Sequence, residues 1–151
     1  MLPKTHILIG FVVSLAIFLL FPQIGWFYAL IIFLSSFLID FDHYLWYVFK
    51  KKDWSVTRAI SWMHKKRDFL LSLSVQQRNQ YQVAVMIFHG VEGLALVALL
   101  IFVHEIFLFV LIGMLIHLAL DLIELYYLKF PLYIKISQIY THIKNRKKLS
   151  L

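Results

Sequence analysis

Two long stretches of this chain contain no lysine or arginine, and they constrain its fold more than any other feature. Residues 5–49 and 79–128 lack both residue types, although the 151-residue chain contains 15 of them. A helix that crosses a bilayer needs about 20 apolar residues, so each stretch is long enough for two spans. The chain is 62% hydrophobic and 15% charged, whereas soluble domains average about 45–50% and 25%. This composition excludes a disordered chain and argues against a freely soluble domain.

Turn-forming or polar residues divide each stretch near its middle, namely Pro22 and Gly25 in the first and His104 with Glu105 in the second. The sequence therefore predicts an all-α integral membrane protein, a four-transmembrane-helix bundle. Residues 1–151 form a single membrane domain with helices at about 6–21, 25–49, 82–103 and 106–128. Loop 50–81 and tail 129–151 are basic, and basic segments favour the cytoplasmic side. We expect a multi-pass protein of the cell (inner) membrane with both termini cytoplasmic.

The central loop and the basic tail both mix apolar and cationic side chains. This mixture is typical of amphipathic helices that lie at the membrane interface. Either the charge sets topology and anchors an interfacial helix, or it binds a specific anionic headgroup. The candidate headgroup contacts are His64, Lys65, Lys66 and Arg67. We expect anionic membrane lipids as partners, keep a homo-oligomer open, and expect no nucleic-acid partner.

Acidic residues and histidines follow the opposite distribution. Six of the eight acidic residues lie inside the two stretches: Asp40, Asp42, Glu92, Glu105, Asp121 and Glu124. Four of the seven histidines lie near them: His6, His43, His89 and His117. A carboxylate at the centre of a bilayer costs about 2.5–3.5 kcal/mol, so such residues need a functional or structural reason. In the predicted topology, these residues lie in the cytoplasmic half of the membrane on all four helices. Glu105 is the exception.

The spacing of these residues places most of them on common helix faces. His117, Asp121 and Glu124 stand at i, i+4 and i+7, which is one stripe of a helix. His89 and Glu92 are separated by three residues, as are Asp40 and His43, whereas Asp42 points elsewhere unless the helix unwinds. Neutral imidazoles and carboxylates are ligands for first-row divalent ions. Protonated carboxylates or a proton relay would also resolve the charge problem.

Three sequence elements resemble those of a known family. They are Thr5-His6 followed by Gly10, the segment Ile39-Asp40-Phe41-Asp42-His43, and His117-x-x-x-Asp121. Together they are similar to the predicted membrane-bound, metal-dependent hydrolases, which include LexA-regulated inner-membrane hydrolases. The resemblance implies metal-site candidates at His6, Asp40, Asp42, His43, His117 and Asp121. Distant similarity to zinc-dependent phospholipase C, which also uses an H-x-x-x-D element, implies a phosphoester substrate. The family's H-R-G-x-T-H-S loop motif has its nearest counterpart at 64–72, which keeps one histidine and the basic residues.

We therefore expect a membrane-embedded, metal-dependent hydrolase that acts on a phosphoester, such as a lipid or lipid-linked substrate, at the cytoplasmic face. It would use one or two divalent ions, zinc first, with manganese or iron as alternatives. The expected metal ligands are His6, Asp40, His43, His89, His117 and Asp121. The expected general bases or further ligands are Asp42, Glu92 and Glu124. The competing hypotheses are a proton- or ion-relay transport protein and a non-catalytic, metal-stabilised membrane scaffold.

Overall fold

The computed structural model describes residues 3–150, and its regular elements are all helices. The elements are α1 (Pro3–Leu20), the 3₁₀ helix η1 (Pro22–Ile24), α2 (Gly25–Leu38), α3 (Phe41–Lys51), α4 (Val56–Ser72), α5 (Val75–Arg78), α6 (Val91–Leu100), α7 (Ile106–Tyr127), α8 (Tyr133–Ile136) and α9 (Gln138–Asn145). Within residues 3–150, extended pairing is limited to an isolated bridge between Tyr81 and Leu149. The expected all-α class is confirmed.

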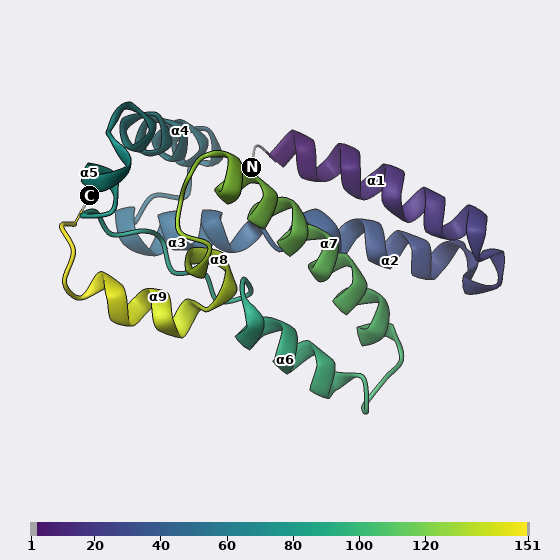
Figure 1. Ribbon diagram of the computed structural model, residues 1–151. Helices are drawn as coiled ribbons and strands as arrows, with labels where there is room; N and C mark the ends of the chain where they lie inside the picture. Colours follow the sequence, from purple (N-terminus) through teal and green to yellow (C-terminus); the bar gives the residue numbers. More distant parts are fainter. Residues whose placement is uncertain (1–2, 151) are drawn as a thin grey trace.

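Helix α2 packs against both α1 and α7, and these three helices form the body of the molecule (Figure 1). Two glycines allow the close approach. A Cβ added to Gly10 on α1 would collide with the Ser36 hydroxyl on α2, and one added to Gly113 on α7 would collide with the Ser35 hydroxyl. Small residues at such crossings let helix backbones approach closely. Close approach strengthens van der Waals packing, which holds helices together in a membrane where the hydrophobic effect does not. The two contacts fix α1 and α7 on α2.

Two helical stretches are long and apolar enough to cross a membrane, Pro22–Lys51 and Ile106–Tyr127. Little of either apolar window, 17% and 28%, is buried inside the protein. Large apolar side chains elsewhere are also exposed, among them Leu20, Val103 and Phe102, the last at 90%. Extended apolar surface of this kind marks contact with a membrane or with another protein. Length, composition and exposure together support membrane association.

The expected first and fourth spans correspond closely to α1 and α7, but the expected second span is not one continuous helix. It is interrupted at Ile39 and Asp40, which separate α2 from α3. The N–H groups of Asp40 and Asp42 donate to carbonyls three residues earlier instead of four, at Phe37 and Ile39. This tighter turn redirects the side chains that follow it. The unwinding that would reorient Asp42 is therefore present.

The expected third span, 82–103, is also different, because α6 begins only at Val91. A helix of ten residues is about 15 Å long, half the thickness of the hydrocarbon core. Residues 82–90 are non-helical because the C-terminal tail supplies their hydrogen bonds. The Val83 N–H donates to Asn145 Oδ1 at 3.1 Å, and the Met86 N–H donates to Gln138 Oε1 at 2.9 Å. Apolar pattern alone cannot distinguish such a short non-helical segment from a helix.

The central loop and the tail contain the helices expected of them, α4 with α5 and α8 with α9. These helices gather with α3 at one end of the molecule, away from the η1 turn and the α6–α7 turn (Figure 1). Helix α4 begins at Ser55, whose side chain accepts from the Arg58 N–H, and α5 begins with a capping box at Ser74 and Gln77. The candidate site lies near this end of the helix bundle.

Candidate metal centre

The structure brings together all six residues expected to be metal ligands, although five different parts of the chain supply them. His6 comes from the first turns of α1, Asp40 from the α2–α3 break and His43 from α3. His89 precedes α6, while His117 and Asp121 stand one turn apart on α7. Four of the six side chains, His6, His89, His117 and Asp121, are almost completely buried. The packing of α1 and α7 on α2 creates the cluster.

The ligating atoms of the cluster converge at short distances. His117 Nε2 lies 3.1 Å from His89 Nε2, 3.3 Å from Asp121 Oδ2 and 3.5 Å from Asp40 Oδ1. His89 Nε2 lies 3.6 Å from both carboxylates, and His43 Nε2 lies 3.6 Å from Asp40 Oδ1. Ligands about 2.0–2.1 Å from a tetrahedral zinc ion lie about 3.3–3.4 Å from one another. The observed spacing matches that of ligands around one ion.

The second nitrogens of His89 and His117 define where their protons are. His117 Nδ1 lies 2.9 Å from the Ser36 carbonyl oxygen, which only accepts. His89 Nδ1 lies 3.0 Å from Asp42 Oδ2, a carboxylate that also accepts from the Phe88 N–H. We therefore assign the proton to Nδ1 in both neutral rings, which leaves a lone pair on each Nε2. Two facing lone pairs repel unless a cation lies between them, and a carboxylate behind a histidine is typical of metal sites.

His6 supports the same interpretation. Neither of its ring nitrogens makes a hydrogen bond, although the side chain is fully buried. Its ring stacks on His117 with centroids 4.3 Å apart, and its Nε2 lies 3.4 Å from Asp121 Oδ1. Buried polar nitrogens without a hydrogen bond are rare, and coordination of an ion is one explanation of such atoms. The donor set and spacing fit a divalent ion.

Three overlapping groups in the described chain could each hold a metal ion: His6 with Asp40 and His117, Asp40 with His43 and His89, and His89 with His117 and Asp121. Each group combines imidazole with carboxylate, the ligand chemistry of zinc, iron and manganese. The groups share members, so the cluster is one continuous centre.

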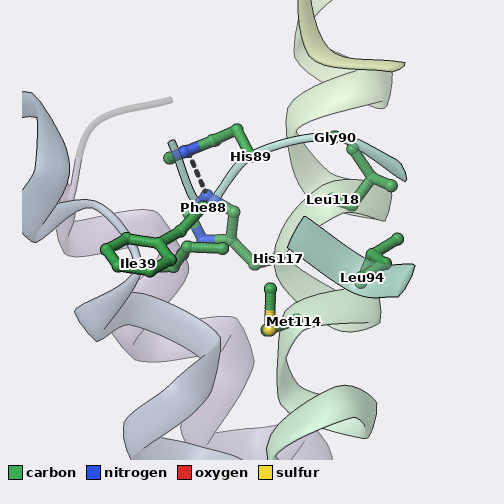
Figure 2. Close-up of a pocket in the computed structure, with 8 residues that line it drawn as sticks. All are labelled: Ile39, Phe88, His89, Gly90, Leu94, Met114, His117 and Leu118. Carbon is green, nitrogen blue, oxygen red and sulfur yellow. Dashed lines mark hydrogen bonds between the residues drawn. The ribbon is translucent and has the colours of Figure 1, made fainter. Parts of the chain in front are cut away.

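An apolar wall closes one side of this centre. Figure 2 shows the His89 and His117 side chains meeting beside a cavity lined by Ile39, Phe88, Gly90, Leu94, Met114 and Leu118. The cavity volume is about 10 Å³, close to the smallest space that holds one water molecule. Such a wall excludes bulk water, and a dry surrounding strengthens electrostatic interactions at the ligands.

A lysine of the basic tail lies inside the centre. Lys135 on α8 places its Nζ 2.7 Å from Asp121 Oδ2 and 3.5 Å from His43 Nε2. The sequence pattern does not indicate this contact, because Lys135 follows Asp121 by 14 positions and lies on a different helix. Only the return of the tail against residues 82–90 brings it into contact.

The three expected general bases all lie outside the converging atoms. Asp42 is behind His89, as described above. Glu92 accepts from the Ser137 hydroxyl at 2.5 Å and from the Gln138 and Ile139 N–H groups at 3.1 Å each, so it caps the start of α9. Glu124 accepts from Arg67 Nη2 at 2.8 Å. Tertiary partners that no spacing rule could indicate hold Glu92 and Glu124 in these positions.

The four expected headgroup contacts occupy one turn of α4, but their side chains have different surroundings. His64 and Lys65 are exposed, while Arg67 pairs with Glu124. The Lys66 ammonium lies over two indole rings, 4.8 Å from the centroid of Trp46 and 5.4 Å from that of Trp62. Burial, together with the nearby ammonium groups of Lys50 and Lys51, lowers the pKa of Lys66 to about 8. These four residues do not converge on the His/Asp cluster.

Comparisons with protein-family models, with curated proteins and with solved structures give no match for this chain.

Proposed function

We propose that the chain is a membrane-embedded, metal-dependent hydrolase that acts on a phosphoester at the cytoplasmic face. The single observation that carries this proposal is the approach of two imidazole Nε2 atoms, those of His89 and His117, to 3.1 Å beside buried carboxylates. A divalent ion is the species that such a group of lone pairs and negative charges favours. The resemblance in sequence to predicted membrane-bound hydrolases adds to the argument.

We propose a four-pass arrangement in which α1, α2 with α3, α6 with its preceding extended segment, and α7 cross the bilayer. Non-helical backbone at membrane depth is tolerated where protein groups satisfy its hydrogen bonds, and the tail satisfies those of Val83 and Met86. The basic helices α4 and α9 then lie at the cytoplasmic interface of an inner membrane, near anionic lipids. Both termini are cytoplasmic in this arrangement.

One divalent ion, zinc first, balances the charge of the centre. Three carboxylates lie within it or directly behind it: Asp40, Asp42 and Asp121. The Lys135 ammonium offsets one negative charge, and a single divalent ion offsets the other two. Glu92 and Glu124, which the sequence alone would add to this count, have their own partners. A second ion would leave an excess of positive charge in an apolar surrounding, which is costly.

A bound divalent ion would supply an activated water and polarise a phosphoryl oxygen. The chain contributes the geometry around it. His89, His117 and Asp121 are the buried ligands, and Asp42 holds the His89 ring in its metal-binding tautomer. Asp40 is the most exposed carboxylate of the centre. We assign it the role of general base, which accepts a proton from a water molecule on the open side.

A metal-stabilised scaffold is the second candidate, and the small volume of the adjoining cavity favours it. A proton relay has less support. On α1, the described buried polar residue between His6 and the η1 turn is Ser14. Its hydroxyl donates to the Phe11 carbonyl of the same helix and so does not extend a chain of polar groups from the centre. A relay needs a continuous series of polar groups across the membrane.

The decisive experiment measures bound metal and phosphate release on the same detergent-purified samples. We expect about one zinc ion per chain in the wild type by mass spectrometry of the metal. We expect zinc-dependent release of phosphate or a phosphorylated headgroup from phospholipid in mixed micelles. His117→Ala should lose both, and His142→Ala, an exposed histidine of α9, should keep both.

Each outcome separates the candidates. Bound zinc without hydrolysis of any phosphoester supports the scaffold and overturns the hydrolase. No bound metal, with a melting temperature that a chelator does not change, overturns both.

A further inference from the structure

We propose that Lys135 is an anion-binding residue of this centre, and that its ammonium group binds a phosphate oxygen of the substrate. The inference rests on the proposed hydrolase function and adds a substrate-binding residue that the sequence elements did not include. Its basis is the location of one cation on the open side of a cluster of carboxylates and histidines.

The exposure of the cluster is asymmetric. His6, His89, His117 and Asp121 have exposed side-chain fractions between 0% and 2%. Asp40 and His43 are 21% and 31% exposed, and Lys135 is 14% exposed. A substrate therefore reaches the centre from the side bounded by Asp40, His43 and Lys135.

A phosphate group that approaches from this side meets negative charge. The carboxylates of Asp40 and Asp121 both lie close to His117 Nε2. A phosphate group beside them would be repelled, because like charges repel strongly in a partly dry site. The Lys135 ammonium counters that repulsion. Lysine binds phosphate as a compact point charge with three donors on a flexible stem, so it can keep Asp121 and add a phosphate oxygen.

Packing contacts on both sides of Lys135 hold its backbone in place, so its side chain stays next to the centre. Gly90, next to His89, has a φ of 90°, and a Cβ there would lie 2.9 Å from the Ile136 carbonyl oxygen. Helix α8 therefore packs directly on the backbone that carries His89. Glu92 then holds the next turn through Ser137 and Gln138. This packing gives one lysine of the tail a fixed position that the exposed lysines lack.

The alternative is that Lys135 only neutralises Asp121 and competes with the ion for its oxygen. The two interpretations differ in what a neutral side chain does. If Lys135 binds the substrate anion, Lys135→Gln loses phosphate binding and keeps its ion. If Lys135 only substitutes for an ion, Lys135→Gln binds zinc more tightly than the wild type does. Its affinity for phosphate then equals that of the wild type.

The test uses the full chain in neutral detergent, loaded with zinc, and measures binding and not turnover. Equilibrium dialysis gives the affinity for inorganic phosphate, and calorimetry gives that for short-chain phosphatidic acid, so free phosphate and lipid phosphate are separate arms. We expect Lys135→Gln to weaken binding by about tenfold or more in at least one arm, because a charge-assisted hydrogen bond is lost. Lys135→Arg should retain most of it. The matched control is Lys144→Gln, an exposed tail lysine over Tyr140, which should bind as the wild type does.

Phosphate binding by Lys135→Gln within about threefold of the wild type would overturn the inference, and so would zinc-loaded wild type that binds neither probe. If Lys135→Gln no longer holds zinc, Lys135→Met and Lys135→Arg decide. Loss of zinc from Lys135→Met but not from Lys135→Arg makes the lysine a structural cation and also overturns the inference. Absence of zinc from the wild type is a failure of the proposed function, and the metal measurement on the same samples identifies it.

Discussion

His89 and His117 approach each other through their Nε2 atoms at 3.1 Å, while their Nδ1 atoms face Asp42 and the Ser36 carbonyl. His89 precedes α6 and His117 is in the middle of α7, so two separate packing interfaces set this one distance. The arrangement is unfavourable for two neutral rings alone and favourable around a cation. The following predictions depend on this pair and on the contacts that hold it.

Asp42→Asn should weaken zinc binding by about 10- to 100-fold, the usual cost of losing a carboxylate behind a metal-binding histidine. An amide at this position can present its NH₂ group to His89 Nδ1 and so favour the wrong tautomer. Competition with a fluorescent zinc chelator measures the effect. The control, Asp68→Asn, removes an exposed carboxylate of α4 and should not change zinc affinity. Equal affinities for the two variants would contradict the assigned role of Asp42.

Gly10→Ala and Gly113→Ala should both destabilise the helix bundle, by about 1–3 kcal/mol each, as overpacked contacts do. Their second-site rescue should differ. After Ser36→Ala, the nearest obstacle to a Cβ at position 10 is the residue 36 Cβ, at 3.1 Å, which a small shift can relieve. A Cβ at position 113 also meets the Ile32 carbonyl oxygen at 2.5 Å, and Ser35→Ala leaves that contact in place.

Thermal unfolding in detergent therefore should show recovery for the Gly10/Ser36 pair and little recovery for the Gly113/Ser35 pair. His117 stands one turn after Gly113 on α7, so Gly113→Ala should also weaken zinc binding. Full rescue of both pairs would mean that α2 and α7 are not packed as described.

Glu92→Gln should detach α9 from the start of α6. Glu92 accepts three hydrogen bonds from the first residues of the tail helix, and an amide retains one acceptor oxygen. We expect a loss of about 1 kcal/mol, as for a helix cap, and faster trypsin cleavage at Lys144 and Arg146. Glu105→Gln is the matched control because Glu105 bonds to Tyr28 at the far end of the molecule. Cleavage rates that are equal in the two variants would contradict the capping role.

The Lys66 amine should react with acetic anhydride as a group whose pKa is about 8. Burial and the Lys50 and Lys51 charges disfavour its protonated form in the folded chain only, so the unfolded chain binds more protons between pH 8 and about 10.5. The contribution of Lys66 to stability therefore rises with pH across that window and is least favourable below pH 8.

Peptide mapping of acetylation between pH 6 and 10 measures this pKa, with exposed Lys65 on the same helix as the reference site. Lys50→Gln removes one of the repelling charges and should raise the pKa of Lys66. A Lys66 titration that is unchanged in Lys50→Gln would contradict the proximity of the two ammonium groups.

The pattern of the sequence predicted the ends of α7 to within one residue and those of α1 to within three, because each is a continuous apolar helix whose packing does not oppose its local preference. It also predicted the six residues of the cluster: helical spacing indicated His89, the family resemblance indicated His6, and both indicated the other four. All of these are properties of one segment at a time.

The failures have a common physical cause. Residues 82–90 are apolar enough for a helix, but Gln138 and Asn145 of the tail accept hydrogen bonds from the backbone of Met86 and Val83, and the segment is not helical. Glu92, an expected general base or further ligand, accepts hydrogen bonds from the start of α9, a contact that the sequence pattern does not indicate. A contact between residues about 50 or 60 positions apart leaves no mark on local periodicity.

The sequence by itself determined the helical class, the separation of cations from acids, and the identity of the histidines and aspartates that form the centre. The tertiary structure alone decided that the tail is part of that centre, that Asp42 supports His89 from behind, and that Lys135 lies against Asp121. Hydropathy and spacing record which face of a segment is apolar or polar. They do not record which distant segment will meet that face, because that choice is made by packing and hydrogen bonding between whole elements.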